Sequence, residues 1–158
     1  EGTPTFPFGA HVAVVEVDTA TGKVVVRRMV AADDAGPVMN PLTFRGQRHG
    51  GLAQGIAQAM LEIMSYDDDG NPVTATLADY SFITAAELPD FELVDSVTPT
   101  TRNLLGVKGI GEAATIGSTP AVQSAVVDAL AHLGVRHVDM PTTPQRVWQA
   151  ITDAKEAV

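Results

Sequence analysis

Alternating apolar and polar positions near the start of the chain predict a pair of β-strands. In "AHVAVVEVD", residues 10–18, one face carries Ala13, Val15 and Val17 and is apolar throughout, while the other face turns polar towards its end. A second β-branched run, "KVVVRRMVAADD" at 23–34, follows after the short polar connection "TATG". We therefore predict an antiparallel hairpin, with the wholly apolar face of the first strand turned towards the core.

A helical period replaces this alternation in residues 44–64, "FRGQRHGGLAQGIAQAMLEIM". Apolar residues recur there every four positions, at Leu52, Ile56, Met60 and Met64. Such a stripe is typical of a helix that buries one face. The pattern predicts a long helix packed against the sheet.

This predicted helix carries an unusual load of glycine. Gly50, Gly51 and Gly55 each cost about 1 kcal/mol relative to alanine inside a helix, and Gly46 adds to that cost if the helix begins early. The residues alone leave two explanations open. Either the glycines allow tight packing on a sheet or another helix, or they let a ligand lie against the start of the helix, where free amide groups and the positive end of the helix dipole favour anions.

Beyond this helix, the pattern predicts a turn and one further strand. "SYDDDGNPV" at 65–73 has the composition of a solvated hairpin turn, and "FELVDSV" at 91–97 reads as a strand.

Two more helices follow. We predict that Thr119 caps the first, that Pro120 lies in its first turn and that it ends at Gly134. Its apolar stripe consists of Val122, Val126 and Leu130. We predict that Thr143 caps the last helix with Pro144 in its first turn. The inner face of this helix is predicted to hold Val147, Trp148 and Ile151.

The order of the elements indicates the fold class. A hairpin, a helix, an irregular segment, a strand and two helices favour an α+β arrangement, with antiparallel strands and packed helices, over a doubly wound nucleotide fold. The length of 158 residues and the 45% hydrophobic content suit one domain, spanning 1–158.

Charge and residue usage exclude several classes of function. A formal net charge of -9 argues against a nucleic-acid partner, because a phosphate backbone would be repelled. The chain has no cysteine, which excludes disulfides, thiolate zinc sites and iron–sulfur clusters held by this chain alone. The four histidines lack the spacing of metal motifs, so we expect no metal bound directly by side chains.

Targeting signals are also missing from the sequence. No run approaches the roughly 20 apolar residues of a membrane span, and no basic and then apolar signal segment opens the chain. We expect a cytoplasmic protein with no membrane span. The opening residues "EGTPTFPFGA" lack a methionine, so we expect the chain to be a piece of a longer one.

The segment "GVKGIGEAATIGSTP" at 106–120 contains a G-x-G-x-x-A pattern typical of dinucleotide binding. Glu112 would then stand directly beside the pyrophosphate and repel it, and no acidic residue ends a second strand about 20 residues later. A phosphate-binding P-loop is also excluded, because glycine and not serine or threonine follows Lys108.

Three roles remain open for Glu112 on the residues alone. The glycines around it let a loop approach a compact ligand, so the carboxylate could face a dry pocket and act as a general base. It could instead cap the following helix, or face solvent.

Three stretches together resemble the C-terminal portion of the large subunit of molybdenum hydroxylases. They are "GQRHGGLAQGIAQAMLE", "DYSFITAAELPDFEL" and "GVKGIGEAATIGSTPAVQSAVVDAL". That family includes xanthine dehydrogenase, aldehyde oxidase and carbon monoxide dehydrogenase, and the chain is most similar to the last type. The resemblance runs from "FPFGAHVAVVEVD" to "MPTTPQRVW". It implies that 1–158 is the C-terminal molybdenum cofactor-binding domain of a longer large subunit, with the xanthine oxidase type of fold.

The resemblance also implies a site. Glu112 matches the glutamate that takes a proton from a metal-bound hydroxide, which then attacks the substrate carbon in an oxidative hydroxylation. The molybdenum is held by the dithiolene of molybdopterin, in its cytosine dinucleotide form, so no metal ligand is expected from this chain. The residues implied to bind the cofactor are Gln47, Gln54, Lys108, Gly109 and Gly111. The chain departs from many relatives at Ala35, where cysteine is common, and at Ala114, where glycine or proline is common.

Further partners follow from the resemblance. They are the rest of the large subunit, an FAD-binding medium subunit, a small subunit with 2Fe-2S clusters, and a small-molecule substrate whose specificity loop lies outside this chain. The fragment alone is expected to be inactive. The alternative is a non-catalytic binding or assembly module that keeps the fold without the cofactor. The retention of both Gln47 and Glu112 favours the enzyme.

Overall fold

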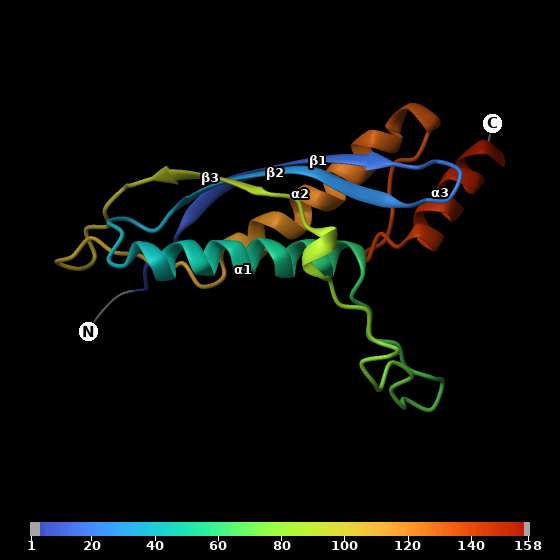
Figure 1. Cartoon of the computed structure of the whole chain (residues 1–158), viewed down its shortest axis with the longest axis horizontal. Coiled ribbons are helices and arrows are strands. Elements are labelled where there is room, and N and C mark those ends of the chain that lie inside the picture. Colours follow the sequence, from blue (N-terminus) through green and yellow to red (C-terminus); the bar gives the residue numbers. More distant parts are fainter. Residues whose placement is uncertain (1–3, 157–158) are drawn as a thin grey trace.

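The computed structural model describes residues 4–156. It contains a three-stranded sheet and three α-helices (Figure 1). The strands are β1 (Phe8–Val17), β2 (Val24–Asp34) and β3 (Phe91–Ser96). The helices are α1 (Pro41–Met60), α2 (Ala113–Leu130) and α3 (Pro144–Glu156), and two short 3-10 helices are η1 (Ala85–Glu87) and η2 (Ala131–Leu133). This arrangement confirms the α+β class.

The sheet has the order β1-β2-β3 and is mixed. β1 and β2 pair antiparallel, which confirms the predicted hairpin, with an irregularity between Val14 and Val15. β3 is the predicted strand, but it pairs parallel to β2, with Met29 opposite Phe91. The expectation of antiparallel strands therefore holds for the hairpin only. The reason is the connection: α1 carries the chain back along the sheet, so β3 starts from the same end as β2.

The predicted inner face of β1 is confirmed. Ala13 and Val15 are half-buried and pack against the core, whereas Val12 and Val14 are exposed. The core lies between this face of the sheet and the helices α1 and α2, which lie on the same side of it (Figure 1). Its buried members include Met29, Leu52, Ile56 and Val122. The prediction that the two helices bury their stripes against a common sheet is confirmed.

α1 begins and ends earlier than its apolar stripe indicates. Asn40 caps the helix, because its Oδ1 accepts hydrogen bonds from the amides of Leu42 and Thr43 at 3.0 and 3.2 Å. The helix ends at Met60, and Met64 lies outside it and is half exposed. The predicted last turn was wrong, because the chain leaves the helix at Leu61 and continues into the segment that projects from the sheet.

α2 starts at Ala113, seven residues before the predicted first turn. Pro120 lies inside the helix, and Thr119 is not a cap but donates its hydroxyl to the Gly55 and Thr115 carbonyls at 3.3 and 3.0 Å. The predicted start was wrong because the small residues before Pro120 lie against α1, and this packing holds them in a helix despite the start signal at Thr119.

α3 begins at Pro144, as predicted, and the hydroxyl of Thr143 accepts a hydrogen bond from the Arg146 amide at 3.4 Å. The buried residues of its inner face are Val147 and Ile151. Trp148 is 45% exposed, so its predicted inner position was wrong. One residue step turns a helix by about 100°, which carries Trp148 away from the stripe that its neighbours form.

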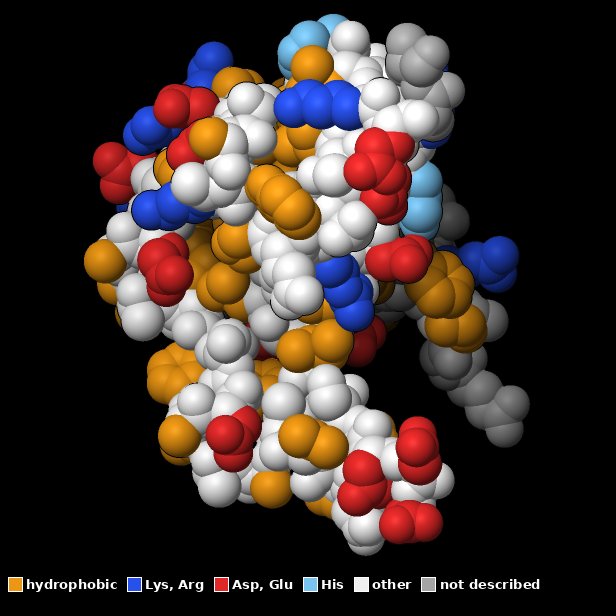
Figure 2. Space-filling model, turned by 90° about the vertical axis from the view of Figure 1, so that its right-hand side faces the viewer, with side chains coloured by type: hydrophobic (Ala, Val, Ile, Leu, Met, Phe, Trp, Pro, Cys, Tyr) orange, Lys and Arg blue, Asp and Glu red, His pale blue; other side chains and the backbone are white. Residues whose placement is uncertain are grey.

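The segment between α1 and η1 projects away from the sheet and helices (Figure 1). Its tip is the predicted turn, which is confirmed: Tyr66 and Pro72 form an antiparallel bridge, and Gly70 has a positive φ of 81°. Asp67 accepts hydrogen bonds from the Asp69 and Asn71 amides. Figure 2 shows acidic side chains gathered at this solvated tip.

Candidate functional site

Two of the α1 glycines are explained by packing within the chain. A Cβ atom on Gly51 would lie 2.7 Å from the Cβ of Ala114, and one on Gly55 would overlap the hydroxyl of Ser118. The hydroxyl of Thr115 also donates to the Gly51 carbonyl at 3.1 Å. The helices α1 and α2 therefore approach so closely at these positions that only glycine fits.

Four other glycines have no such reason. Gly46, Gly50, Gly109 and Gly111 would each place a Cβ in open space, with no atom within 4 Å. None of them adopts a positive φ. Neither local contacts nor backbone strain in residues 4–156 therefore requires glycine there. Two of them lie on the exposed side of α1 and two in the loop before α2. The open space beside them could hold a ligand or a segment that does not belong to residues 4–156.

Gln47 and Gln54 project from α1 on the side of that loop. Gln47 is exposed and lines a hollow of about 170 Å³ together with Lys108 and Ile110. Gln54, two turns further along, is exposed, and its Oε1 accepts a long hydrogen bond of 3.5 Å from the hydroxyl of Thr115 in α2. Gln47 thus lies beside the loop before α2 and Gln54 beside the first turn of α2, and they do not share one hollow.

Glu112 occupies the cap position of α2. Its carbonyl accepts a hydrogen bond from the Ile116 amide at 3.0 Å, but its side chain makes no capping hydrogen bond. The residue is exposed and does not line the hollow beside Gln47. Because the side chain makes no capping hydrogen bond, its carboxylate is not used to cap the helix.

Lys108 differs from the other predicted residues because its side chain is buried. Its ammonium nitrogen lies 2.6 Å from the Oδ1 of Asp34 and 4.3 Å from the ring centre of Phe8. Its backbone amide donates to the Ala35 carbonyl at 2.8 Å. Sequence reasoning missed Asp34, although an acidic pair that ends a β-branched strand is a signal for a buried polar contact.

Asp34 is fully buried at the end of β2 and is well satisfied by hydrogen bonds. Besides Lys108, it accepts from the Gly36 amide at 2.9 Å and from the Ser96 hydroxyl at 3.1 Å. Burial raises the pKa of this carboxyl, but the hydrogen bonds from Lys108, Gly36 and Thr98 outweigh that effect and hold the pKa well below its ordinary value. Asp34 is therefore ionised at neutral pH and forms a buried ion pair.

A second buried ionic network lies beside it. Arg48 of α1, 1% exposed, donates to Asp33 at 3.0 Å and to Asp95 at 2.6 Å. Its remaining donors reach the carbonyls of Ala31 and Val94, both at 2.7 Å. One arginine therefore ties the helix to β2 and β3.

His11 of β1 extends this network. Its Nε2 lies 2.9 Å from Asp33, whereas its buried Nδ1 has no hydrogen-bond partner in residues 4–156. Burial raises the pKa of the Asp33 carboxyl, but His11 and Arg48 together lower it below its ordinary value. These groups connect the sheet to α1 at the same end as Asp34 and Lys108.

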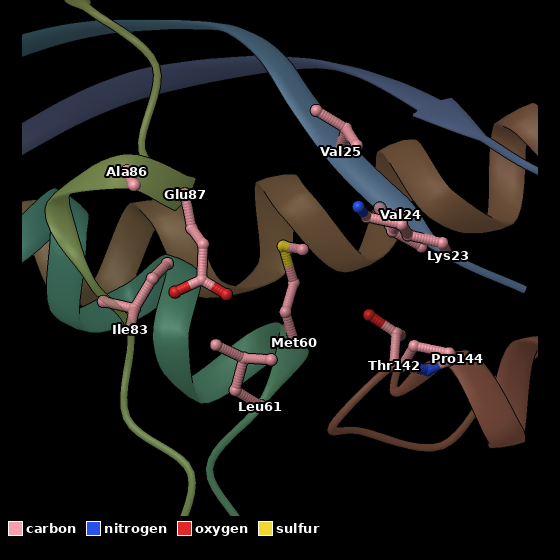
Figure 3. Close-up of a pocket in the computed structure, with 10 residues that line it drawn as sticks. All are labelled: Lys23, Val24, Val25, Met60, Leu61, Ile83, Ala86, Glu87, Thr142 and Pro144. Atoms are coloured by element: carbon pink, nitrogen blue, oxygen red, sulfur yellow. The ribbon is translucent and has the colours of Figure 1, made fainter.

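A different pocket lies at the far end of α1 (Figure 3). Its volume is about 310 Å³, and it contains none of the sequence-predicted site residues. The Glu87 carboxylate in it is hydrogen-bonded to Thr84, and the Thr142 hydroxyl donates to the Ala59 carbonyl. These polar groups are already engaged, so we do not assign the site to this pocket.

Within residues 4–156, no group of three or more His, Asp or Glu side chains is arranged to hold a metal ion. Over the same residues, no helix has the length and hydrophobicity needed to cross a membrane.

Comparisons with known proteins identify relatives of known type. The model of the molybdopterin cofactor-binding domain family matches residues 1–89. The chain is 46% identical, over 149 residues, to the carbon monoxide dehydrogenase large chain of Hydrogenophaga pseudoflava, covering 94% of this chain and 19% of that one. It is 34% identical to the aldehyde oxidoreductase molybdenum-binding subunit PaoC of Escherichia coli K12, covering 92% of this chain and 20% of PaoC.

Solved structures share the fold. The carbon monoxide dehydrogenase from Oligotropha carboxidovorans superposes with a TM-score of 0.91 at 38% identity, covering 96% of this chain and 19% of that one. The quinoline 2-oxidoreductase from Pseudomonas putida 86 gives a TM-score of 0.87 at 41% identity, over 92% of this chain and 18% of that one. The chain spans about a fifth of the length of these relatives.

These matches confirm the family that the sequence motifs indicated, and they make the chain homologous to subunits of molybdenum-dependent oxidoreductases. The chain belongs to the molybdopterin cofactor-binding domain family, as part of a molybdenum hydroxylase large subunit of the carbon monoxide dehydrogenase type.

Proposed function

We propose that this chain helps to hold the molybdenum cofactor of a hydroxylase and supplies its general base, Glu112. The observation that carries the proposal is the set of four glycines without any contact that explains them: Gly46, Gly50, Gly109 and Gly111. Gly46 stands next to Gln47 in α1, and Gly109 and Gly111 flank Ile110, which lines a hollow together with Gln47. A cofactor that needs close approach of the backbone would account for all four.

The residues present fit a pterin dinucleotide. A glutamine side chain offers two donors and one acceptor, so Gln47 and Gln54 can bind groups with both donors and acceptors, as a pterin ring has. Gly109 and Gly111 have open space where a side chain would stand, so a ligand can come close to their backbone. When bound, the cofactor would supply the two-electron oxidation of the substrate.

Glu112 would accept the proton released as the substrate is hydroxylated. Its side chain is exposed and not engaged in capping α2, so its carboxylate oxygens are available to receive a proton. A general base of this kind typically contributes about 10²- to 10⁴-fold in rate.

The remaining parts of the proposal concern the whole enzyme. We assign residues 1–158 to the C-terminal part of a longer large subunit, with molybdopterin in its cytosine dinucleotide form. The medium subunit with FAD and the small subunit with 2Fe-2S clusters would take the electrons onward. The substrate would be a small molecule, recognised by segments outside this chain.

One of these four glycines, Gly109, gives a direct test of cofactor binding. Gly109→Val places its Cβ where no atom of residues 4–156 lies within 4 Å, so the apo chain should keep its melting temperature. The assembled enzyme should lose most of its molybdenum and pterin, because the added side chain occupies the space reserved for the cofactor. Normal molybdenum and pterin contents in the Gly109→Val enzyme would contradict the proposal.

A further inference from the structure

Before α2 begins, the loop that carries Glu112 is held to the end of β2 through Lys108, by both its side chain and its backbone amide. Lys108 is buried, with a side chain 6% exposed, and its ammonium lies 2.6 Å from the Asp34 carboxylate. Between Lys108 and Glu112 the chain contains Gly109 and Gly111, which have no side chains to pack. Glycine gives the backbone its greatest freedom, so the position of this loop depends on its anchors.

The backbone around Lys108 fits against the end of β2. Gly36 and Gly106 have positive φ values of 67° and 68°, and a Cβ on Gly36 would overlap the Gly106 carbonyl oxygen. The Lys108 amide donates to Ala35, and a Cβ on Gly106 would lie 2.8 Å from Pro99. The 106–108 segment is thus laid directly on 34–36.

We infer that Asp34 and Lys108 form a buried clamp that positions the Glu112 loop, so that both are positioning residues and neither is a catalytic residue. The catalytic meaning of the clamp rests on the proposed function, but the clamp itself is a property of this chain. It assigns a role to Asp34, which is not among the site residues predicted from the sequence. It also gives Lys108 a task other than contact with the cofactor.

Electrostatics explain why the pair holds firmly. A buried charge is costly unless it is paired and hydrogen-bonded, so neither side chain can leave without stranding the other. The Phe8 ring covers the ammonium at 4.3 Å and adds a cation–π contact. The Ser96 hydroxyl and the Gly36 amide also donate hydrogen bonds to the Asp34 carboxylate.

Hydrogen exchange of this chain tests the clamp without any cofactor. We expect Lys108→Met and Asp34→Asn each to raise the exchange rate of the 106–112 amides by about tenfold or more, because each variant strands a buried partner. The double variant should exchange no faster than the worse single variant, since both changes break one interaction. Glu92→Gln, which removes an exposed ion pair with Arg28, serves as the matched control and should leave 106–112 unchanged.

The results distinguish the clamp from its alternatives. Exchange at 106–112 that matches the Glu92→Gln control, or single effects that add in the double variant, would overturn the clamp. If Lys108→Met fails to fold, the double variant, in which both charges are gone, should fold and still show faster exchange than the control. A double variant as protected as the control would also overturn it.

The assembled enzyme separates the clamp from direct cofactor contact by Lys108. For the clamp, Asp34→Asn and Lys108→Met should lower kcat by similar factors and leave KM and molybdenum content nearly unchanged. Loss of molybdenum in Lys108→Met alone would assign Lys108 to the cofactor and overturn its role as a positioning residue. Because exchange reports on the clamp without turnover, failure of Glu112 as the base would not affect that result.

Discussion

A methyl group on Gly51 of α1 would lie 2.7 Å from the Cβ of Ala114 in α2. The missing side chain at Gly51 lets the two helices approach this closely, and the start of α2, just after Glu112, thereby lies beside Gln54 of α1. Ala114 is one of the positions where the sequence departs from many relatives. The small side chain at that position is what the packing against Gly51 requires.

Replacement of this glycine should separate packing from helix propensity. We expect Gly51→Ala to lower the free energy of unfolding by about 1–3 kcal/mol, because the added methyl group overpacks the contact with Ala114. The neighbouring Gly50 faces open space, so Gly50→Ala should raise that free energy by up to about 1 kcal/mol. Urea unfolding of both variants measures this difference. Equal stabilities for the two would show that the helices do not need close approach here.

Arg48 should be among the most sensitive charged positions in the chain. Arg48→Met leaves the buried carboxylate of Asp33 without its arginine, and we expect a loss of about 3–5 kcal/mol in the free energy of unfolding. Arg28→Met removes an ion pair whose side chains are more than half exposed, and it should cost less than about 1 kcal/mol. If the two variants lose similar stability in urea unfolding, the buried network does not support the fold in this way.

The buried aspartates predict how stability depends on pH. The pKa values of Asp33 and Asp34 are lowered in the folded chain, so the folded state binds fewer protons than the unfolded state. Their stabilisation is complete above about pH 4, near the pKa of unfolded aspartate, and it is lost as the pH falls further. Urea midpoints measured from pH 6 to pH 2.5 should therefore fall steeply below pH 4.

Asp34→Asn removes one of these two groups. We expect this variant to be less stable than wild type at pH 7, and its urea midpoint to fall less steeply below pH 4. Glu92→Gln, at an exposed ion pair, should keep nearly the wild-type slope. An Asp34→Asn slope equal to that of wild type would mean that Asp34 is not the group whose protonation weakens the fold.

Local patterns were sufficient to predict much of the fold. The hairpin, the body of α1 and the start of α3 followed from periodicity and from capping residues, which act over a few neighbouring positions. The start of α2 did not, because Thr119 and Pro120 carry the signals of a helix start while packing against α1 extends the helix backwards to Ala113. The parallel pairing of β3 depends on the path of the chain through α1, which no local pattern records.

The candidate site likewise contains residues that motifs identify and one residue that only the fold reveals. Its motifs identified Gln47, Gln54 and Glu112, and the structure shows the two glutamines beside the segment that carries the glutamate. The clamp partner of Lys108 could not be found from the sequence, because Asp34 lies 74 positions away and only the fold brings the two together. Ionic pairs over such separations have no spacing that a motif could express.

The role of Glu112 is the central claim, and one substitution tests it most directly. Glu112→Gln keeps the size and hydrogen bonding of the side chain but cannot accept the proton. In the assembled enzyme we expect turnover to fall by about 10²- to 10⁴-fold, with bound molybdenum nearly unchanged. Turnover and molybdenum content should be measured on the same preparation. Near-normal turnover would contradict the general-base role, and loss of turnover together with loss of molybdenum would make Glu112 a structural residue.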